Sequence, residues 1–459
     1  MSIQIKVDFS KRTGKKVRPL HGFNAGPVTK VFTYDARPLF VEGGFPYVRL
    51  HDVEYPYGSG EFVDIPCVFK NFDADETDPA NYNFGNTDEY IRQCLSVGSK
   101  IIYRLGVSIE HSPVKRYTDP PKDFAKWARI CEHVIRHYNE GWADGYHWNI
   151  EYWEIWNEAD LTKKGAMWSG TPEEFYEFYC VAATHLKSCF PDLKIGGCGW
   201  ACSKGDYIPN FLRYIAEKEV RIPLDFHSWH IYKSSPDGFV KRANEQRALL
   251  DQYGYHDAES ILDEWNLIYS WDFEGQAASY PAMKDHRGAS FYAGVLCALQ
   301  EQTDVTLATN FEADVVKEYC GVFDVEKMCV GGLSSNGKMM AQLKPTKGFY
   351  AFKCFNSLYR MQNSVAISCD NEGVFATAAA GDHGNGMLIS NQSGEHTEAV
   401  LELCGVQGEI VVRLTDAART NEVLVRLSTD GALKLTLPMA PDAFAYVGTD
   451  LPDPTPTYQ

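Results

Sequence analysis

Short β-rich runs alternate with amphipathic stretches from the N-terminal region to about residue 360. From Phe124 to Tyr138, apolar residues recur with a period near 3.6, which predicts a helix. Thr171, Pro172 and Glu174 form a capping-box pattern that predicts the start of another. Further helices are predicted at 286–299 and 347–359, and strands before Phe23 and at 47–51, 100–105, 152–156, 194–196, 224–232, 260–264 and 304–310.

These strand–helix units repeat roughly eight times, which predicts a parallel sheet flanked by helices. We therefore expect an α/β protein with a (β/α)8 TIM barrel over residues 12–358. An open nucleotide-binding sheet is disfavoured, because residues 196–199 (Gly-Gly-Cys-Gly) lack the spacing of a Rossmann phosphate loop.

The pattern changes after the helix at 347–359. Short alternating runs, broken by Gly, Asp and Asn, predict an antiparallel β-sandwich over residues 359–450. Alternating apolar residues at 2–10 predict a half-buried strand that joins this sandwich. The proline-containing segment 451–459 is expected to be an extended tail. The predicted sandwich strands lie at 374–377, 386–389, 399–403, 410–414, 433–437 and 443–447.

Charge and cysteine usage exclude several classes of protein. Acidic residues outnumber basic ones, 61 to 44, which gives a net charge of −17. Proteins that bind nucleic-acid phosphates carry the opposite charge, so we expect no nucleic-acid partner. No run of about 18 apolar residues and no signal-peptide core occur, so we expect no membrane contact. The 13 cysteines include no Cys-x-x-Cys pair, so we expect a cytoplasmic protein without disulfides or zinc.

Two predicted strands end in a glutamate beside tryptophan and asparagine, at residues 156–158 and 263–266. In a barrel, chemistry sits at the C-terminal ends of the strands. We count these as strands 4 and 7, so Glu158 and Glu264 could overhang one mouth. Glycoside hydrolysis needs such a pair, one protonated and one ionised. A lone glutamate is usually a surface acid, but two in matched contexts favour a catalytic role.

These two motifs resemble those of glycoside hydrolase family 39, in the clan of retaining (β/α)8 glycosidases, which includes β-xylosidases and α-L-iduronidases. The resemblance covers roughly residues 17–360 and includes segments 47–51, 82–84, 225–232 and 344–353. It implies Glu158 as general acid/base and Glu264 as nucleophile. It also implies that Asn157 contacts the sugar 2-hydroxyl, and that His230 and Tyr232 line the sugar site.

The chain departs from that family where Pro-Asn usually follows the acid/base, because residues 159–160 are Ala-Asp. This leaves the leaving-group specificity open. The aromatic-rich segment 266–285 is a second place where specificity could differ.

Other polar and aromatic residues at strand ends are weaker candidates for substrate binding. Arg49 and His51 share a strand face, and Arg49 either contacts substrate or forms a buried ion pair that fixes Glu264 or another acid at the barrel mouth. Asp263 should point to the opposite face from Glu264, which argues against a catalytic role. The remaining candidates are Asn24, Trp265 as a stacking wall, and Glu312 at the end of the last strand.

No cofactor or metal is expected. His227 and His230 are three residues apart on a strand, so they point to opposite faces and cannot share one ion without a bulge.

We therefore predict a retaining exo-acting glycoside hydrolase whose substrate is an oligosaccharide or small neutral glycoside, in the first place a β-xyloside. Arabinosides, galactosides and glucosides stay open. An iduronide would need a cationic clamp for its carboxylate, and no such clamp stands out in the sequence. The same residues would also suit a transglycosylase or a non-catalytic sugar-binding barrel. The family resemblance also suggests a homo-oligomer.

Overall fold

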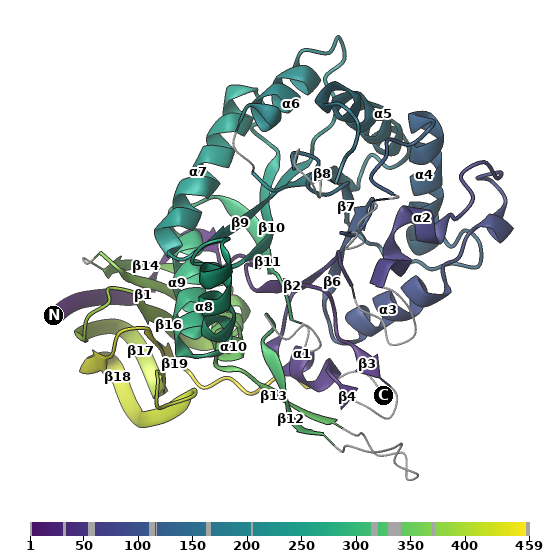
Figure 1. Cartoon of the computed structure of the whole chain (residues 1–459). Helices are drawn as coiled ribbons and strands as arrows, with labels where there is room; N and C mark the ends of the chain where they lie inside the picture. Colours follow the sequence, from purple (N-terminus) through teal and green to yellow (C-terminus); the bar gives the residue numbers. More distant parts are fainter. Residues whose placement is uncertain are drawn as a thin grey trace, which may run out of the picture.

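Eight parallel strands close into a barrel, which confirms the predicted fold (Figure 1). The computed structural model describes residues 2–30, 34–53, 60–109, 115, 117–161, 167–202, 205–313, 320–328, 341–369 and 372–455. In chain order, the barrel strands are β2 (Gly22–Asn24), β5 (Tyr47–Leu50), β6 (Lys100–Leu105), β7 (Tyr152–Ile155), β8 (Lys194–Trp200), β9 (Phe226–Lys233), β10 (Glu259–Leu267) and β11 (Val305–Asn310). The motifs with Glu158 and Glu264 thus belong to the fourth and seventh barrel strands, β7 and β10, as predicted.

Helices form an outer ring around the strands (Figure 1). The predicted capping box is present, because the Thr171 hydroxyl accepts from the Glu174 amide at 3.2 Å and the Glu174 carboxylate accepts from the Thr171 amide at 2.7 Å. The helices are α1 (Arg37–Gly43), α2 (Ile65–Val68), α3 (Gly85–Ser96), α4 (Phe124–Glu140), α5 (Pro172–Cys189), α6 (Tyr207–Ala216), α7 (Pro236–Gln252), α8 (Phe273–Lys284), α9 (His286–Gln302) and α10 (Lys347–Met361). Smaller elements are the 3-10 helices η1 (Gly60–Val63) and η2 (Pro79–Asn81) and the strand pairs β3 (Thr29–Lys30) with β4 (Tyr34–Asp35) and β12 (Phe323–Met328) with β13 (Ala341–Pro345).

A bulge interrupts the pairing of β10 with β9. Leu262 pairs with Trp229, and Glu264, two residues later, pairs with the next residue, His230. Asp263 is therefore the extra residue, and a bulge re-aims side chains locally. Asp263 and Glu264 both reach the interior of the barrel, so the prediction that Asp263 points away from Glu264 is wrong.

The remaining strands form one seven-stranded sheet, in the order β1-β14-β15-β16-β19-β17-β18. β1 pairs antiparallel with β14 and parallel with β17, so the sheet curls back on itself. Two predicted strands, 399–403 and 410–414, are one long strand, and β1 runs beyond residue 10, to Lys16. The strands are β1 (Ser2–Lys16), β14 (Asn363–Cys369), β15 (Val374–Gly381), β16 (Gly384–Asn391), β17 (Thr397–Thr415), β18 (Glu422–Met439) and β19 (Ala443–Gly448).

Strands β15, β16 and β19 of this sheet are largely buried on both faces. One face forms its own core, with Ile5 and Leu401 among its residues. The other contributes Leu388 and Phe444 to the large core that lies between the barrel strands and their helices. This second face is buried because the sheet lies beside α9 and α10 (Figure 1). The sheet and the barrel therefore share apolar packing.

The last described residues, 451–455, run along α10. The Pro452 carbonyl accepts from Arg360 at 2.7 Å, and Asp453 lies 2.8 Å from Lys353. The rest of the predicted tail, 456–459, lies outside the described residues. No helix in the described part of the chain is both long enough and apolar enough to cross a bilayer.

Candidate active site

The chain turns sharply where β7 ends. Trp156 and Glu158 have left-handed backbone conformations, with φ of 70° and 49°, which non-glycine residues adopt rarely and often at functional sites. The Trp156 ring packs outward between Trp127 and Trp168, and the Glu158 amide donates to the carbonyl of Gly199 on β8 at 2.9 Å. These contacts hold the Glu158 side chain at the mouth of the barrel.

A cavity of about 810 Å³ at this mouth brings Glu158 and Glu264 together. One oxygen of each carboxyl group and a ring nitrogen of His230 lie within 4.8 Å of one another. Two carboxyl groups in one cavity at this separation can act on the same bond of a bound sugar. The cavity is also lined by Asp52, Ile109, Leu161, Ala201, Cys202, Ile231, Tyr232, Lys233, Arg242, Asn266, Ile268, Trp271, Tyr280, Met283, Phe311 and Cys320.

Glu158 is in surroundings that favour its protonated form. Burial and the negative charge of Asp160 raise the pKa of Glu158 to about 8. His230 Nδ1 lies 2.9 Å from Glu158 Oε1, and burial lowers the pKa of His230, which favours a neutral ring. At neutral pH, Glu158 can therefore donate a proton.

Glu264 is held by donors that stabilise its ionised form. The Tyr232 hydroxyl donates to Glu264 Oε1 at 2.6 Å, and Arg49 Nη1 donates to Oε2 at 3.3 Å. Burial raises the pKa of Glu264, and these two neighbours oppose that rise. The two carboxyl groups thus differ in their surroundings, which is how one site separates an acid from a nucleophile.

Arg49 is completely buried behind Glu264 and binds two further acids. Its Nε lies 2.8 Å from Glu154 and 3.0 Å from Asp263. Burial raises the pKa of Asp263 well above its ordinary value. Burial would raise the pKa of Glu154 as well, but Arg49 and hydrogen bonds from Asp263 and Ser228 outweigh it and lower that pKa. The raised pKa of Asp263 and the lowered pKa of Glu154 favour a protonated Asp263 beside an ionised Glu154, which limits the negative charge around one guanidinium.

Of the residues predicted to bind substrate, His230 and Tyr232 line the cavity, whereas Arg49, Asn157, Asn24 and His51 lie behind its wall. Asn157 Oδ1 accepts from Arg49 at 2.7 Å and Asn24 Oδ1 accepts from Arg49 at 3.2 Å. Arg104 donates to His51 at 3.2 Å. The buried Asn157 Nδ2 has no protein partner among the described residues. Direct sugar contact by these four residues stays a prediction.

Trp265 does not face the cavity. Its ring packs against Phe239 of α7, Tyr292 of α9 and Phe352 of α10. The prediction that it stacks on sugar is wrong, because the residue after Glu264 on a strand points to the opposite side, here toward the helices. Glu312 is also fully buried and outside the cavity lining, with Oε1 4.0 Å from Cys320 Sγ.

Several cavity residues were not recognised from the sequence. Trp271 is 63% exposed, lines the cavity and meets the Tyr232 ring edge to face at 5.2 Å. The only sequence feature that pointed to Trp271 was the aromatic-rich composition of segment 266–285. Lys233 and Arg242 bring positive charge to the wall and had no recognisable motif.

Gly199 was also missed, although it is tightly enclosed. A Cβ at this position would lie 2.8 Å from Arg49 Nη2, 3.1 Å from Asn157 Oδ1 and 3.2 Å from His230 Nε2. Its φ of 53° is left-handed as well. Only glycine lets three site residues approach this strand so closely.

Comparisons with known proteins agree with this geometry. The model of the family described as Glycosyl hydrolases family 39 matches residues 33–310. A beta-xylosidase from Geobacillus stearothermophilus is 25% identical over 344 residues, 69% of this chain and 62% of that protein. One from Caldicellulosiruptor saccharolyticus is 28% identical over 218 residues, 45% of this chain and 40% of its own length. The matches therefore span less than two thirds of either relative.

The fold agrees with solved structures over nearly its whole length. The crystal structure of a glucosidase from Croceicoccus marinus superimposes with a TM-score of 0.75 at 23% identity, covering 98% of both chains. This likeness concerns the fold, whereas the family model matches more than half of the sequence. The chain therefore belongs to glycosyl hydrolases family 39.

Proposed function

We propose that this protein is a retaining, exo-acting glycoside hydrolase in which Glu158 is the general acid/base and Glu264 the nucleophile. The observation that carries the proposal is the approach of their carboxylate oxygens to within 4.8 Å in one cavity. Retaining enzymes place the two carboxyl groups about 5–5.5 Å apart, whereas inverting enzymes leave about 6.5–9.5 Å for a water molecule. The short separation supports direct attack by Glu264.

The reaction takes two steps. Glu158 gives its proton to the glycosidic oxygen while Glu264 attacks the anomeric carbon, so the bond to the aglycone breaks and a glycosyl ester forms. Ester formation removes the negative charge of Glu264, which makes ionised Glu158 less unfavourable. Glu158 then takes a proton from water, the water oxygen attacks the anomeric carbon, and Glu264 leaves as a carboxylate.

The substrate we propose is a neutral β-xyloside, because both sequence relatives named above are beta-xylosidases. Glucosides come next, given the glucosidase with the similar fold. Lys233 and Arg242 on the cavity wall favour a second candidate, an anionic glycone such as a uronide, since a cation there could pair with its carboxylate.

Hydrolysis of a panel of nitrophenyl glycosides, including xylosides, glucosides and uronides, tests both the activity and the glycone. We expect release from one glycone and a loss of about a thousandfold or more in Glu264→Gln. The matched control is Glu259→Gln, at the opposite end of the same strand, which should keep its activity. Equal release by wild type and Glu264→Gln would rule out the proposed nucleophile.

The variant Glu158→Gln tests the general acid/base role of Glu158 independently of the nucleophile. We expect a loss of about 10²–10⁴ on substrates with poor leaving groups, and a smaller loss on nitrophenyl substrates, whose departure needs little protonation. The stereochemistry is checked by following the anomeric signal of the first product by NMR. Initial formation of the inverted anomer would overturn the retaining mechanism.

A further inference from the structure

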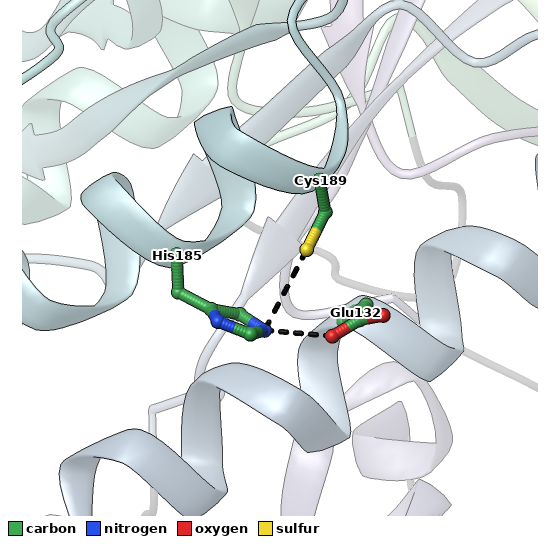
Figure 2. Close-up of side chains that lie close together, drawn as sticks. All are labelled: Glu132, His185 and Cys189. Atoms are coloured by element: carbon green, nitrogen blue, oxygen red, sulfur yellow. Dashed lines mark hydrogen bonds and ion pairs between the residues drawn. The ribbon is translucent and has the colours of Figure 1, made fainter.

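A second cluster of chemically active side chains lies on the outer helices, between α4 and α5. Figure 2 shows Glu132 of α4 facing His185 and Cys189 of α5. His185 Nε2 lies 2.7 Å from Glu132 Oε2 and 3.8 Å from Cys189 Sγ. One ligand atom from each residue lies within 4.8 Å of the other two. An ordinary His–Glu ion pair would explain the first contact but not the convergence of the thiol.

The arrangement has the form of a three-ligand metal site. His185 and Cys189 are four residues apart on one helix, so they project from the same face. Imidazole, thiolate and carboxylate are ligands that Zn²⁺ accepts, at about 2.0–2.3 Å. Around a tetrahedral ion such ligand atoms lie roughly 3.2–3.8 Å apart, so the nitrogen–sulfur distance already fits and the nitrogen–oxygen distance must open by about half an ångström.

The surroundings of the cluster orient one ligand and admit water. Arg136 Nε donates to Glu132 Oε1 at 2.8 Å, which orients the carboxylate and leaves Oε2 directed at the cluster. Outer hydrogen bonds of this kind commonly position metal ligands. The His185 side chain is 30% exposed and that of Glu132 15%, so solvent can reach the cluster and supply a fourth ligand.

We propose that Glu132, His185 and Cys189 bind one zinc ion, with water as the fourth ligand. Binding displaces the thiol proton of Cys189 and any proton on His185 Nε2, both of which pass to solvent. The ion would join α4 to α5, the two helices that flank strand β7 in the sequence. The sequence offered no signal for it, because it has no Cys-x-x-Cys pair and the third ligand comes from another helix.

Co²⁺ is a suitable probe, because a thiolate ligand to Co²⁺ produces an intense near-ultraviolet charge-transfer band. Chelator-treated full-length protein is titrated with Co²⁺, and Zn²⁺ is then added as competitor. We expect one equivalent of Co²⁺ to produce the band and Zn²⁺ to abolish it. Binding to the folded state should also raise the Tm.

Cys189→Ser should eliminate the band, and His185→Gln should weaken binding by at least about tenfold. Cys404→Ser is the matched control, since Cys404 is an exposed free thiol in the C-terminal sheet, and should leave the titration unchanged. Circular dichroism of each variant with chelator present checks that the fold is intact. No band in the wild type, or a band that survives Cys189→Ser, would overturn the proposal.

Discussion

Arg49 shows how one residue organises a charged site. Its guanidinium group touches Glu154, Asp263 and Glu264, which come from two different barrel strands. Such a group can stay buried only if its charge is matched and its hydrogen bonds are satisfied. Arg49 thereby positions the proposed nucleophile without lining the cavity.

The raised pKa of Glu158 predicts the alkaline limit of activity. Only the protonated carboxyl group can donate to the leaving group, so kcat/KM should fall as the pH rises through about 8. Asp160→Asn removes the charge that helps raise this pKa but keeps an oxygen for the Ala201 amide, to which Asp160 is bonded at 2.9 Å. The alkaline limb of the kcat/KM profile should therefore move to lower pH. A limb that stays in place would show that Asp160 does not act on Glu158.

The close contacts of Gly199 predict that substituting this residue impairs catalysis as well as stability. In Gly199→Ala the new Cβ would push against Arg49, Asn157 and His230, and a displacement near 1 Å can lower a rate by about a hundredfold. The matched control is Gly98→Ala, where φ is also positive, at 87°, but no atom lies within 4 Å of the added Cβ. Both should lose about 1–3 kcal/mol of stability in denaturant unfolding. Equal kcat/KM values for the two variants would contradict the prediction.

At the scale of elements, the connection from β10 to the start of α8 contributes to the rim of the cavity through Ile268 and Trp271. Tyr269, Trp271 and Phe273 are all exposed aromatic residues, and large exposed apolar groups that cluster often mark a binding surface. Trp271 alone among the three lines the cavity. Because an exo-acting enzyme buries the terminal sugar and leaves the aglycone near the rim, we expect this ring to stack on the aglycone.

Trp271→Ala should lower kcat/KM by about tenfold for oligosaccharides, mostly through a higher KM, and less for methyl glycosides. Phe273→Ala is the control, because Phe273 is 82% exposed and does not line the cavity. Steady-state kinetics with both substrate types measure the difference. Equal losses on both substrates would instead indicate that Trp271 only supports Tyr232.

At the scale of the whole molecule, the barrel and the C-terminal sheet share one core through α9 and α10. β1 adds to this coupling, because the first strand of the chain pairs with strands β14 and β17 near its end. Two units joined in this way should unfold together.

Ile5→Ala tests this coupling, because Ile5 is fully buried in the core of the sheet. The substitution should lower the free energy of unfolding by about 2–5 kcal/mol and shift fluorescence and circular dichroism transitions equally. Lys6→Ala, next to it on β1, removes a side chain that is 61% exposed and should change stability by less than about 1 kcal/mol. Separate transitions for barrel and sheet in Ile5→Ala would show that they unfold independently.

The sequence alone determined the order and type of the main elements. Apolar periods of 2 and 3.6 follow from strand and helix geometry, so the barrel strands, the helices α4, α5, α9 and α10 and the places of Glu158 and Glu264 could be predicted. Local signals also located the capping box of Thr171, since all its groups lie within four residues.

Only the tertiary structure decided which side chains meet. The bulge at Asp263 changes which face that residue occupies, and no alternation pattern encodes it. Trp265 and Trp271 look equally suited to bind sugar in the sequence, but one packs under the helices and the other lines the cavity. Contacts between residues far apart in the chain, as between Glu132 and His185, depend on how helices pack. For the same reason, the sequence identified the proposed acid and nucleophile but not the residues that surround them.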